Sequence, residues 1–236
     1  MLHNQENVSR ADMVARAVRK VYDEVKASPR PNTPIIWSEY NASYMNEVDV
    51  TDSAFMGPWL ANTIRLCDGL TVMMSYWTFS DVFEEQGVVK KPFYGGYGLI
   101  AAGGIPKAPL NDFALLHRLG TQRLMPALKD ALVTKRSDGT LAIVIWNYAE
   151  PGANGAPRDF DVQLSHGQAT SVTVVDDQHG SSLTAWRKMG EPAFPTRQQQ
   201  AELRAAGRMP PRKTLAGSTL HLTLAPHALA LIEARP

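Results

Sequence analysis

A single glutamate at the end of a short apolar run is the first residue of this chain that could do chemistry. Glu39 follows Ile35, Ile36 and Trp37, whose β-branched and aromatic side chains favour a buried strand. A carboxylate at such a place must be hydrogen-bonded, paired or in use, because burying a free carboxylate is costly. In parallel α/β barrels the reacting groups lie at the carboxyl ends of the strands. From this run alone, Glu39 is either a catalytic acid or a structural residue that caps the next segment.

A second apolar run leads to a loop that carries three more acids. Residues 70–77, Leu-Thr-Val-Met-Met-Ser-Tyr-Trp, predict a strand covered on both faces. The loop that follows, residues 78–87, holds Asp81, Glu84 and Glu85 beside aromatic side chains. Acids and aromatics together on a long loop after a strand are typical of a binding surface. The alternative is a solvated acidic loop.

The pattern of the chain predicts two kinds of structure. Helices are expected at residues 10–27, from about residue 51 to residue 67, and around residues 110–119, and with the two strands they give an α, β, α, β order that favours a parallel sheet. After residue 122 the pattern changes to short alternating strands separated by Gly, Pro, Asn and Asp, which favour an antiparallel β-sandwich. These strands are expected at residues 140–147, 159–164, 170–176, 218–224 and 227–233, with a short helix near residues 198–206. We therefore place a domain boundary near residue 122, between domains 1–122 and 123–236.

Composition excludes several classes of function. The chain is 44% hydrophobic and 20% charged with a net charge of +1, which describes a globular protein without the basic patch of a nucleic-acid or acidic-membrane partner. Cys67 is the only cysteine, so no internal disulfide and no multi-cysteine metal site can form. The histidines show no metal-ligand spacing. We expect neither a metal nor a cofactor.

Two further patterns carry little function. The first residues lack the basic and apolar regions of a signal peptide and no run is long enough to span a bilayer, so the cytoplasm is the default expectation while the compartment stays open. The glycine-rich residues 95–98 lack the Gly-Lys-Ser/Thr ending of a phosphate-binding loop, and we interpret them as backbone flexibility. The sequence gives no prediction of oligomeric state.

The two strand ends together resemble a known family. Residues 37–44, Trp-Ser-Glu-Tyr-Asn-Ala-Ser-Tyr, and residues 75–85, Ser-Tyr-Trp-Thr-Phe-Ser-Asp-Val-Phe-Glu-Glu, are similar to the last two active-site strands of glycoside hydrolase family 39, the β-xylosidase family. The likeness continues through residues 104–109, 116–120, 186–190 and 229–236, and so covers nearly the whole chain. It implies the C-terminal part of a (β/α)8 TIM barrel, its last two βα units, followed by an accessory antiparallel β-sandwich.

The resemblance also implies roles for single residues. Glu39 matches the family's nucleophile, and Trp77 matches the aromatic side chain that floors the sugar subsite. Glu84 and Glu85 match acids that hydrogen-bond sugar hydroxyls, and Asn41 follows the nucleophile and helps to arrange the site. The implied reaction is retaining hydrolysis that releases xylose from the non-reducing ends of xylo-oligosaccharides, which requires no metal or cofactor.

One part of the family's pattern is missing. The family's acid/base glutamate lies in an Asn-Glu-Pro motif several strands before the nucleophile. Here the glutamate–proline pairs are Glu150-Pro151 and Glu191-Pro192, preceded by Ala149 and Gly190, and both follow Glu39. The chain is therefore expected to hold half of an active site and to need the N-terminal barrel part that it lacks.

Two other functions fit the same residues. The chain could be a non-catalytic remnant or carbohydrate-binding fragment, in which Trp77, Glu84 and Glu85 bind sugar without turnover. It could also be α-L-iduronidase-like, since the family contains such enzymes. A uronic-acid substrate calls for a cation near the sugar carboxylate, whereas the acids Glu84 and Glu85 favour a neutral pentose.

Overall fold

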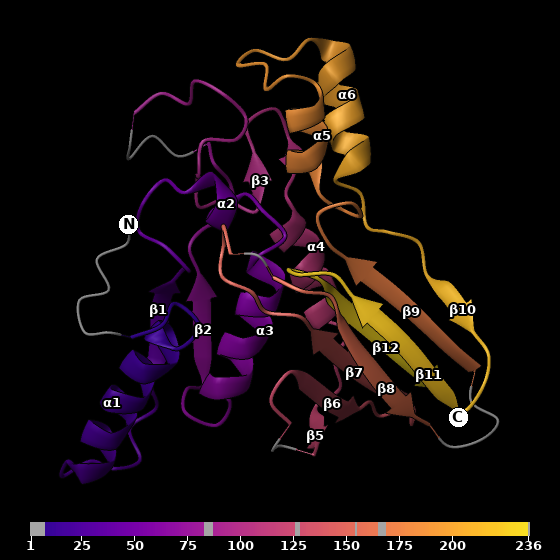
Figure 1. The fold of residues 1–236 in the computed structure, drawn as a ribbon. Coiled ribbons are helices and arrows are strands. Elements are labelled where there is room, and N and C mark those ends of the chain that lie inside the picture. Colours follow the sequence, from indigo (N-terminus) through magenta and orange to yellow (C-terminus); the bar gives the residue numbers. More distant parts are fainter. Residues whose placement is uncertain (1–7, 83–86, 126–127, 154, 165–168, 236) are drawn as a thin grey trace.

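The first part of the chain alternates helices and strands. A computed structural model describes residues 8–82, 87–125, 128–153, 155–164 and 169–235 (Figure 1). In it, strands β1 and β2 pair in parallel, as the α, β, α, β order predicts. The region from residue 48 to residue 67 forms two helices where the sequence predicts one. The elements are α1 (Met13–Ala27), β1 (Ile36–Tyr40), α2 (Val48–Thr51), α3 (Met56–Cys67) and β2 (Met73–Tyr76).

Strands β1 and β2 are more exposed than their apolar sequences predict. Ile36 of β1 is 58% exposed and Met73 of β2 is 51% exposed, and Val72, which directly precedes β2, is 69% exposed. The reason is the size of the sheet, because within the described residues β1 and β2 pair only with each other. Helix α1 does cover part of them, since Ala15 and Val18 pack in one cluster with the partly buried Trp37 and Met74. The expectations of a buried strand at residues 35–37 and of a strand covered on both faces within residues 70–77 are therefore wrong for this chain.

The second part of the chain is built on a large antiparallel sheet. Its strand order is β10-β9-β12-β7-β6-β5, and each neighbouring pair is antiparallel. Strands β8 and β11 form a separate antiparallel pair, and β3 and β4 form a short hairpin before helix α4. The bounds are β3 (Ile100–Ala101), β4 (Ile105–Pro106), α4 (Ala108–Leu116), β5 (Gln122–Leu124), β6 (Ala131–Lys135), β7 (Leu141–Trp146), β8 (Arg158–Gln163), β9 (Ala169–Val175), β10 (Lys213–Leu215), β11 (Thr219–Leu224) and β12 (Leu229–Arg235).

The two faces of this sheet enter two different cores. Side chains alternate along a strand, so Ile143 and Ile145 of β7 face away from Val144. Ile143 and Ile145 pack with Leu220 and Leu224 of β11. On the opposite face, Val144 belongs to a cluster that also contains side chains of α3 and α4.

That second cluster crosses the boundary expected near residue 122. Trp59 of α3 and Trp146 of β7 are both fully buried in it, so the helices of the first part and the sheet of the second share one core. Where a domain boundary falls stays a prediction.

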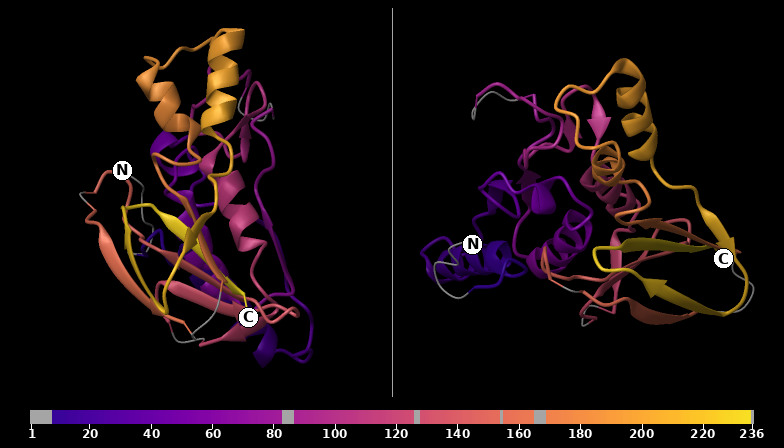
Figure 2. Two further views of the ribbon diagram at one scale, coloured as in Figure 1. Left: turned by 90° about the vertical axis from the view of Figure 1, so that its right-hand side faces the viewer. Right: turned by 45° about the horizontal axis from the view of Figure 1, so that its top comes forward.

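Two helices between β9 and β10 stand at one end of the molecule. Figure 2 shows α5 (Ser182–Lys188) and α6 (Arg197–Ala206) side by side, beyond the edge of the sheet. Trp186 of α5 and Leu203 of α6 are buried against Phe93 and Ile105, which belong to the segments after β2. The insertion thus packs on the segments that follow β2. Among the described residues, no helix is long and apolar enough to cross a membrane.

A buried acid in α4 gives the first testable prediction. Asp112 is fully buried, and neither of its carboxyl oxygens has a hydrogen-bond partner among the described residues. Burial raises the pKa of Asp112 well above its ordinary value. Because the folded pKa is raised, this carboxyl group favours the fold most below its ordinary pKa, and the contribution is lost as the pH rises.

Replacing Asp112 with Asn is expected to raise the free energy of unfolding at pH 8 by about 1–3 kcal/mol, because the neutral amide avoids the cost of ionising or protonating a buried carboxyl group at that pH. The gain should shrink towards pH 4, where wild-type Asp112 is protonated at no cost. Urea denaturation at several pH values measures it, with the exposed Asp23→Asn as the control. A gain that is the same at pH 4 and pH 8 contradicts the titration of Asp112.

Candidate active site

The two strand ends predicted to carry the site lie side by side. Glu39 is the penultimate residue of β1 and is exposed, and Trp77 directly follows β2. The pairing register shifts between Trp37 and Tyr40, so Glu39 sits in an irregular part of β1. Beyond it the ladder continues, because the Trp77 amide donates a hydrogen bond to the carbonyl oxygen of Tyr40 at 3.0 Å. The carboxyl ends of both strands therefore meet at one edge.

Asn41 joins the two strand ends. Its side-chain amide nitrogen donates a hydrogen bond to the carbonyl oxygen of Trp77. Its side-chain oxygen accepts from the amide of Ala42 at 2.6 Å. Asn41 therefore fixes the backbone after β1 against the backbone after β2. The structure brings Asn41 and Trp77 together in this way and places Glu39 on the same edge.

The predicted sugar-binding acids cannot be placed. Glu84 and Glu85 lie outside the described residues. Asp81, the third acid of the same loop, is described and does not face solvent. It is buried and forms an ion pair with Lys107, so the interpretation of Asp81 as part of an exposed binding surface is wrong.

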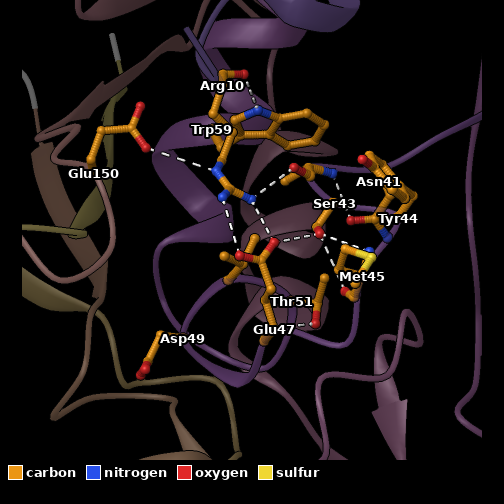
Figure 3. A network of polar contacts seen from close by, with 12 residues as sticks. Arg10, Asn41, Ser43, Tyr44, Met45, Glu47, Asp49, Thr51, Trp59 and Glu150 are labelled. Atoms are coloured by element: carbon orange, nitrogen blue, oxygen red, sulfur yellow. Dashed lines mark hydrogen bonds and ion pairs between the residues drawn. The ribbon is translucent and has the colours of Figure 1, made fainter. Parts of the chain in front are cut away.

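An arginine that the sequence did not single out holds the backbone after Asn41. Figure 3 shows Arg10 reaching from the segment before α1 to this loop. Its guanidinium donates to the carbonyl oxygen of Ala42 at 3.0 Å and forms an ion pair with Glu47 at 3.1 Å. Ser43 also donates to Glu47, at 2.5 Å. The path of residues 42–47 is thus fixed by one cation and one carboxylate.

The same arginine contacts the second part of the chain. The Nε of Arg10 lies 3.8 Å from a carboxyl oxygen of Glu150 (Figure 3). On its other side, the indole nitrogen of Trp59 donates to the backbone carbonyl of Arg10 at 2.9 Å. Glu150, one of the two glutamates followed by proline, is therefore engaged with Arg10 and Tyr148. Only the folded chain reveals this network, because its members are far apart in sequence.

Replacing Arg10 with Met is expected to lower the free energy of unfolding by about 1–3 kcal/mol, because Glu47 and the Ala42 carbonyl lose a charged donor. Urea denaturation measures the loss, and the exposed Arg30→Met serves as the control. If Arg10→Met and Arg30→Met unfold at the same urea concentration, the role given to Arg10 is contradicted.

The segment after β2 is held by backbone pairing. Residues 78–81 lie beside residues 97–100, with hydrogen bonds from Thr78 to Tyr97 and from Asp81 to Ile100 at 3.0 and 2.9 Å. The Tyr97 hydroxyl donates to the carbonyl oxygen of Tyr44 at 2.6 Å, which ties this segment to the one after β1. Within the described residues, no group of three or more His, Cys, Asp or Glu side chains is arranged to hold a metal ion.

Comparison with known proteins identifies the relatives of this chain. The sequence profile of the family described as "Glycosyl hydrolases family 39" matches residues 1–219. A beta-xylosidase of Geobacillus stearothermophilus is 34% identical over 218 residues, which are 89% of this chain and 43% of that protein. A beta-xylosidase of Caldicellulosiruptor saccharolyticus is 27% identical over 234 residues, 93% of this chain and 47% of that protein.

The fold also resembles that of a solved beta-xylosidase structure. The crystal structure of a monomeric beta-xylosidase from Caulobacter crescentus CB15 superposes with a TM-score of 0.82 at 27% sequence identity, covering 96% of this chain and 50% of that one. The chain thus spans about half the length of the relatives that it matches. Its match to the family profile over residues 1–219 shows that this chain belongs to glycosyl hydrolase family 39.

Proposed function

We propose that this chain is the C-terminal portion of a retaining β-1,4-xylosidase, which releases xylose from the non-reducing ends of xylo-oligosaccharides. The observation that carries the proposal is the exposed Glu39 at the carboxyl end of a parallel strand, beside the junction that Asn41 makes with Trp77. Family membership and the names of the beta-xylosidase relatives support this substrate class.

Each site residue has a chemical task in this reaction. The Glu39 carboxylate attacks the anomeric carbon, and the glycosidic bond breaks as a glycosyl ester forms. The leaving oxygen takes a proton from a second carboxylic acid, which then removes a proton from the water that hydrolyses the ester. Trp77 provides an apolar face for the sugar ring, Asn41 keeps the two strand ends in place, and Glu84 and Glu85 accept hydrogen bonds from sugar hydroxyls.

The second carboxylic acid comes from the rest of the barrel. We place β1 and β2 as the last two strands of a (β/α)8 barrel, with residues 123–236 as an accessory β-sandwich. The exposed Ile36, Val72 and Met73 support this placement, because neighbouring barrel strands and helices would cover such side chains. The two sheets that share the Ile143 and Leu220 core support the sandwich.

A second candidate is sugar binding without turnover. It is favoured by the absence of an Asn-Glu-Pro motif from the sequence. In that case the aromatic and acidic groups after β2 would bind xylose, and Glu39 would attack nothing.

Proton NMR of the first product distinguishes these functions. A protein that carries this chain together with a complete barrel is given an aryl β-D-xyloside, whose hydrolysis releases a single xylose, and the anomeric signals of that xylose are followed before mutarotation. Retention predicts that β-xylose appears first. Initial release of α-xylose contradicts the retaining mechanism, and binding without any hydrolysis supports the second candidate.

A further inference from the structure

A buried lysine lies between two buried aspartates from the segments that follow the two candidate strands. The ammonium nitrogen of Lys107 is 2.5 Å from a carboxyl oxygen of Asp52 and 2.6 Å from one of Asp81. All three side chains are fully buried. The reaction proposed above does not use this triad. Burying charged groups is costly, and ion pairs offset that cost only when their geometry is good and further hydrogen bonds satisfy the charged groups.

The triad joins the segments that leave the two candidate strands. Asp52 follows α2, in the segment between β1 and α3, and Asp81 lies in the segment after β2. Lys107 immediately precedes α4. One ammonium group thus holds both segments against the start of a third element, at the carboxyl ends of β1 and β2.

The glycine-rich residues 95–98 wrap around the triad. The amide of Gly95 donates to Asp52 at 2.7 Å, and the amide of Gly98 donates to Asp81 at 2.6 Å. Lys107 donates to the carbonyl oxygen of Gly96 at 2.9 Å. A side chain at Gly98 would bring its Cβ within 2.3 Å of the Asp81 amide nitrogen. These glycines therefore allow a close approach to the charges, and our interpretation of them as flexible backbone is replaced by a packing role.

When both aspartates are ionised, the triad holds two negative charges and one positive charge, so one negative charge remains uncompensated. Burial, opposed by Lys107, raises the pKa of Asp52 from 3.8 to about 6, and burial raises that of Asp81 as well. Among the described residues, the phenols of Tyr76 and Tyr94 also interact with both aspartates. The protonation state of the triad therefore changes below pH 7.

We propose that Lys107 is a positioning residue, which holds the segments after β1 and β2 in the arrangement that presents Trp77 to a sugar. This inference rests on the proposed function of the site. Its physical basis is the short sequence separation between Trp77 and Asp81. Asp81 lies four residues after Trp77, so a clamp on Asp81 fixes the segment that directly follows Trp77.

Hydrogen exchange on the full chain tests the clamp without depending on catalysis. Lys107→Met leaves two buried acids without their cation, so the amides of residues 78–81 and 95–100 should exchange roughly a hundredfold faster or more. The amides of β7 and β12 should keep their wild-type rates, and the exposed Lys20→Met should change neither set. Equal acceleration in the loops and in the large sheet means a general loss of stability and overturns the positioning role.

Asp52→Asn provides a milder variant and a pH signature. In the wild type, the folded arrangement of residues 78–81 and 95–100 favours protonated Asp52, because the pKa of Asp52 is raised there. The protection of these amides, corrected for intrinsic exchange, should therefore fall as the pH rises from about 4 to about 6. A pKa raised to about 6 predicts a fall of up to roughly a hundredfold, and Asp52→Asn should remove most of it. Unchanged pH dependence in this variant overturns the assignment to the triad.

Sugar binding separates this inference from the proposed function. Sugar binding is measured on a protein that carries this chain with a complete barrel, with wild-type Lys107 or with Lys107→Met. Where xylobiose binds the wild type, Lys107→Met should weaken binding at least about tenfold, in step with the loss of loop protection. Faster loop exchange with unchanged sugar affinity overturns the positioning role and leaves the proposed function standing. Failure of the wild type to bind xylosides removes the proposed function, while the exchange results still decide whether Lys107 clamps the two segments.

Discussion

Replacing Glu39 with Gln is expected to lower kcat for an aryl β-D-xyloside by at least about 10⁴-fold, because removing a catalytic nucleophile has effects of this order or larger. The amide cannot form the glycosyl ester, so neither half of the reaction proceeds. The measurement is the release of the phenol from the aryl xyloside by a protein that carries this chain with a complete barrel. The change should fall on kcat far more than on the affinity for xylose, since Trp77 and the loop after β2 are untouched.

The matched control is Glu24→Gln, which changes the same side chain on the exposed face of α1. It should keep kcat within about twofold of the wild type, since an exposed substitution away from the site changes stability by only about 0.5 kcal/mol. A Glu39→Gln variant that is folded and retains a tenth of the wild-type kcat would remove Glu39 from the role of nucleophile.

Replacing Glu233 with Ala is expected to lower the free energy of unfolding by about 3 kcal/mol, because it leaves arginines without the buried acid that pairs with them. Glu233 lies in the central strand β12 and is only 4% exposed. It forms ion pairs with Arg118 and with Arg136, the latter at 2.8 Å, and Arg212 lies 3.6 Å away. We place the effect at the low end of the range for buried pairs because Arg118 and Arg136 keep 21% and 25% of their exposure.

The same substitution has a defined pH dependence. Burial acts to raise the pKa of Glu233, but hydrogen bonds from Arg136 and Arg118 outweigh it and hold the pKa below its ordinary value. A lowered folded pKa means that the ion pairs stabilise the fold above the ordinary pKa, and that this contribution is lost as the pH falls. Urea denaturation should therefore show a large difference from wild type at pH 7 and a smaller one at pH 3.

The exposed Glu202→Ala on α6 is the control and should change stability by no more than about 0.5 kcal/mol. A loss for Glu233→Ala that is just as large at pH 3 would show that packing of the side chain, and not its charge, stabilises the sheet.

Local sequence patterns predicted most of the longer helices and strands and missed most of the short ones. Helix α1 follows from apolar residues at helical spacing, and the helix near residues 198–206 is α6, where Thr196 and Gln199 form a capping box. The long strands of the antiparallel sheet follow from their alternation. Strands β3, β4, β5, β6 and β10 and helix α5 were not predicted. Helix α5 is short and packs chiefly by burying Trp186 against Phe93, a contact between distant residues.

The sequence predicted only those residues of the candidate site that lie at the ends of the two strands. Glu39 lies near the end of β1, Asn41 follows β1 and Trp77 follows β2, so parallel pairing is enough to bring them to one edge. Lys107 could not be found in this way, because its partners lie 55 and 26 residues before it, at positions 52 and 81. Nor could the sequence predict that Asp81 is buried, since its neighbours in the chain look like an exposed acidic loop.

The central claim is that Glu39 is the nucleophile, and a trapped intermediate tests it most directly. A 2-deoxy-2-fluoro-β-xyloside with a dinitrophenyl leaving group needs little acid assistance to form the glycosyl ester, and the fluorine slows the hydrolysis of that ester. A folded protein that carries this chain with a complete barrel is incubated with the reagent, digested and analysed by mass spectrometry. We predict one modified peptide with the fluoroxylosyl group on Glu39, and no adduct in Glu39→Gln. An adduct on another carboxylate, such as Glu47 or Glu150, would contradict the account.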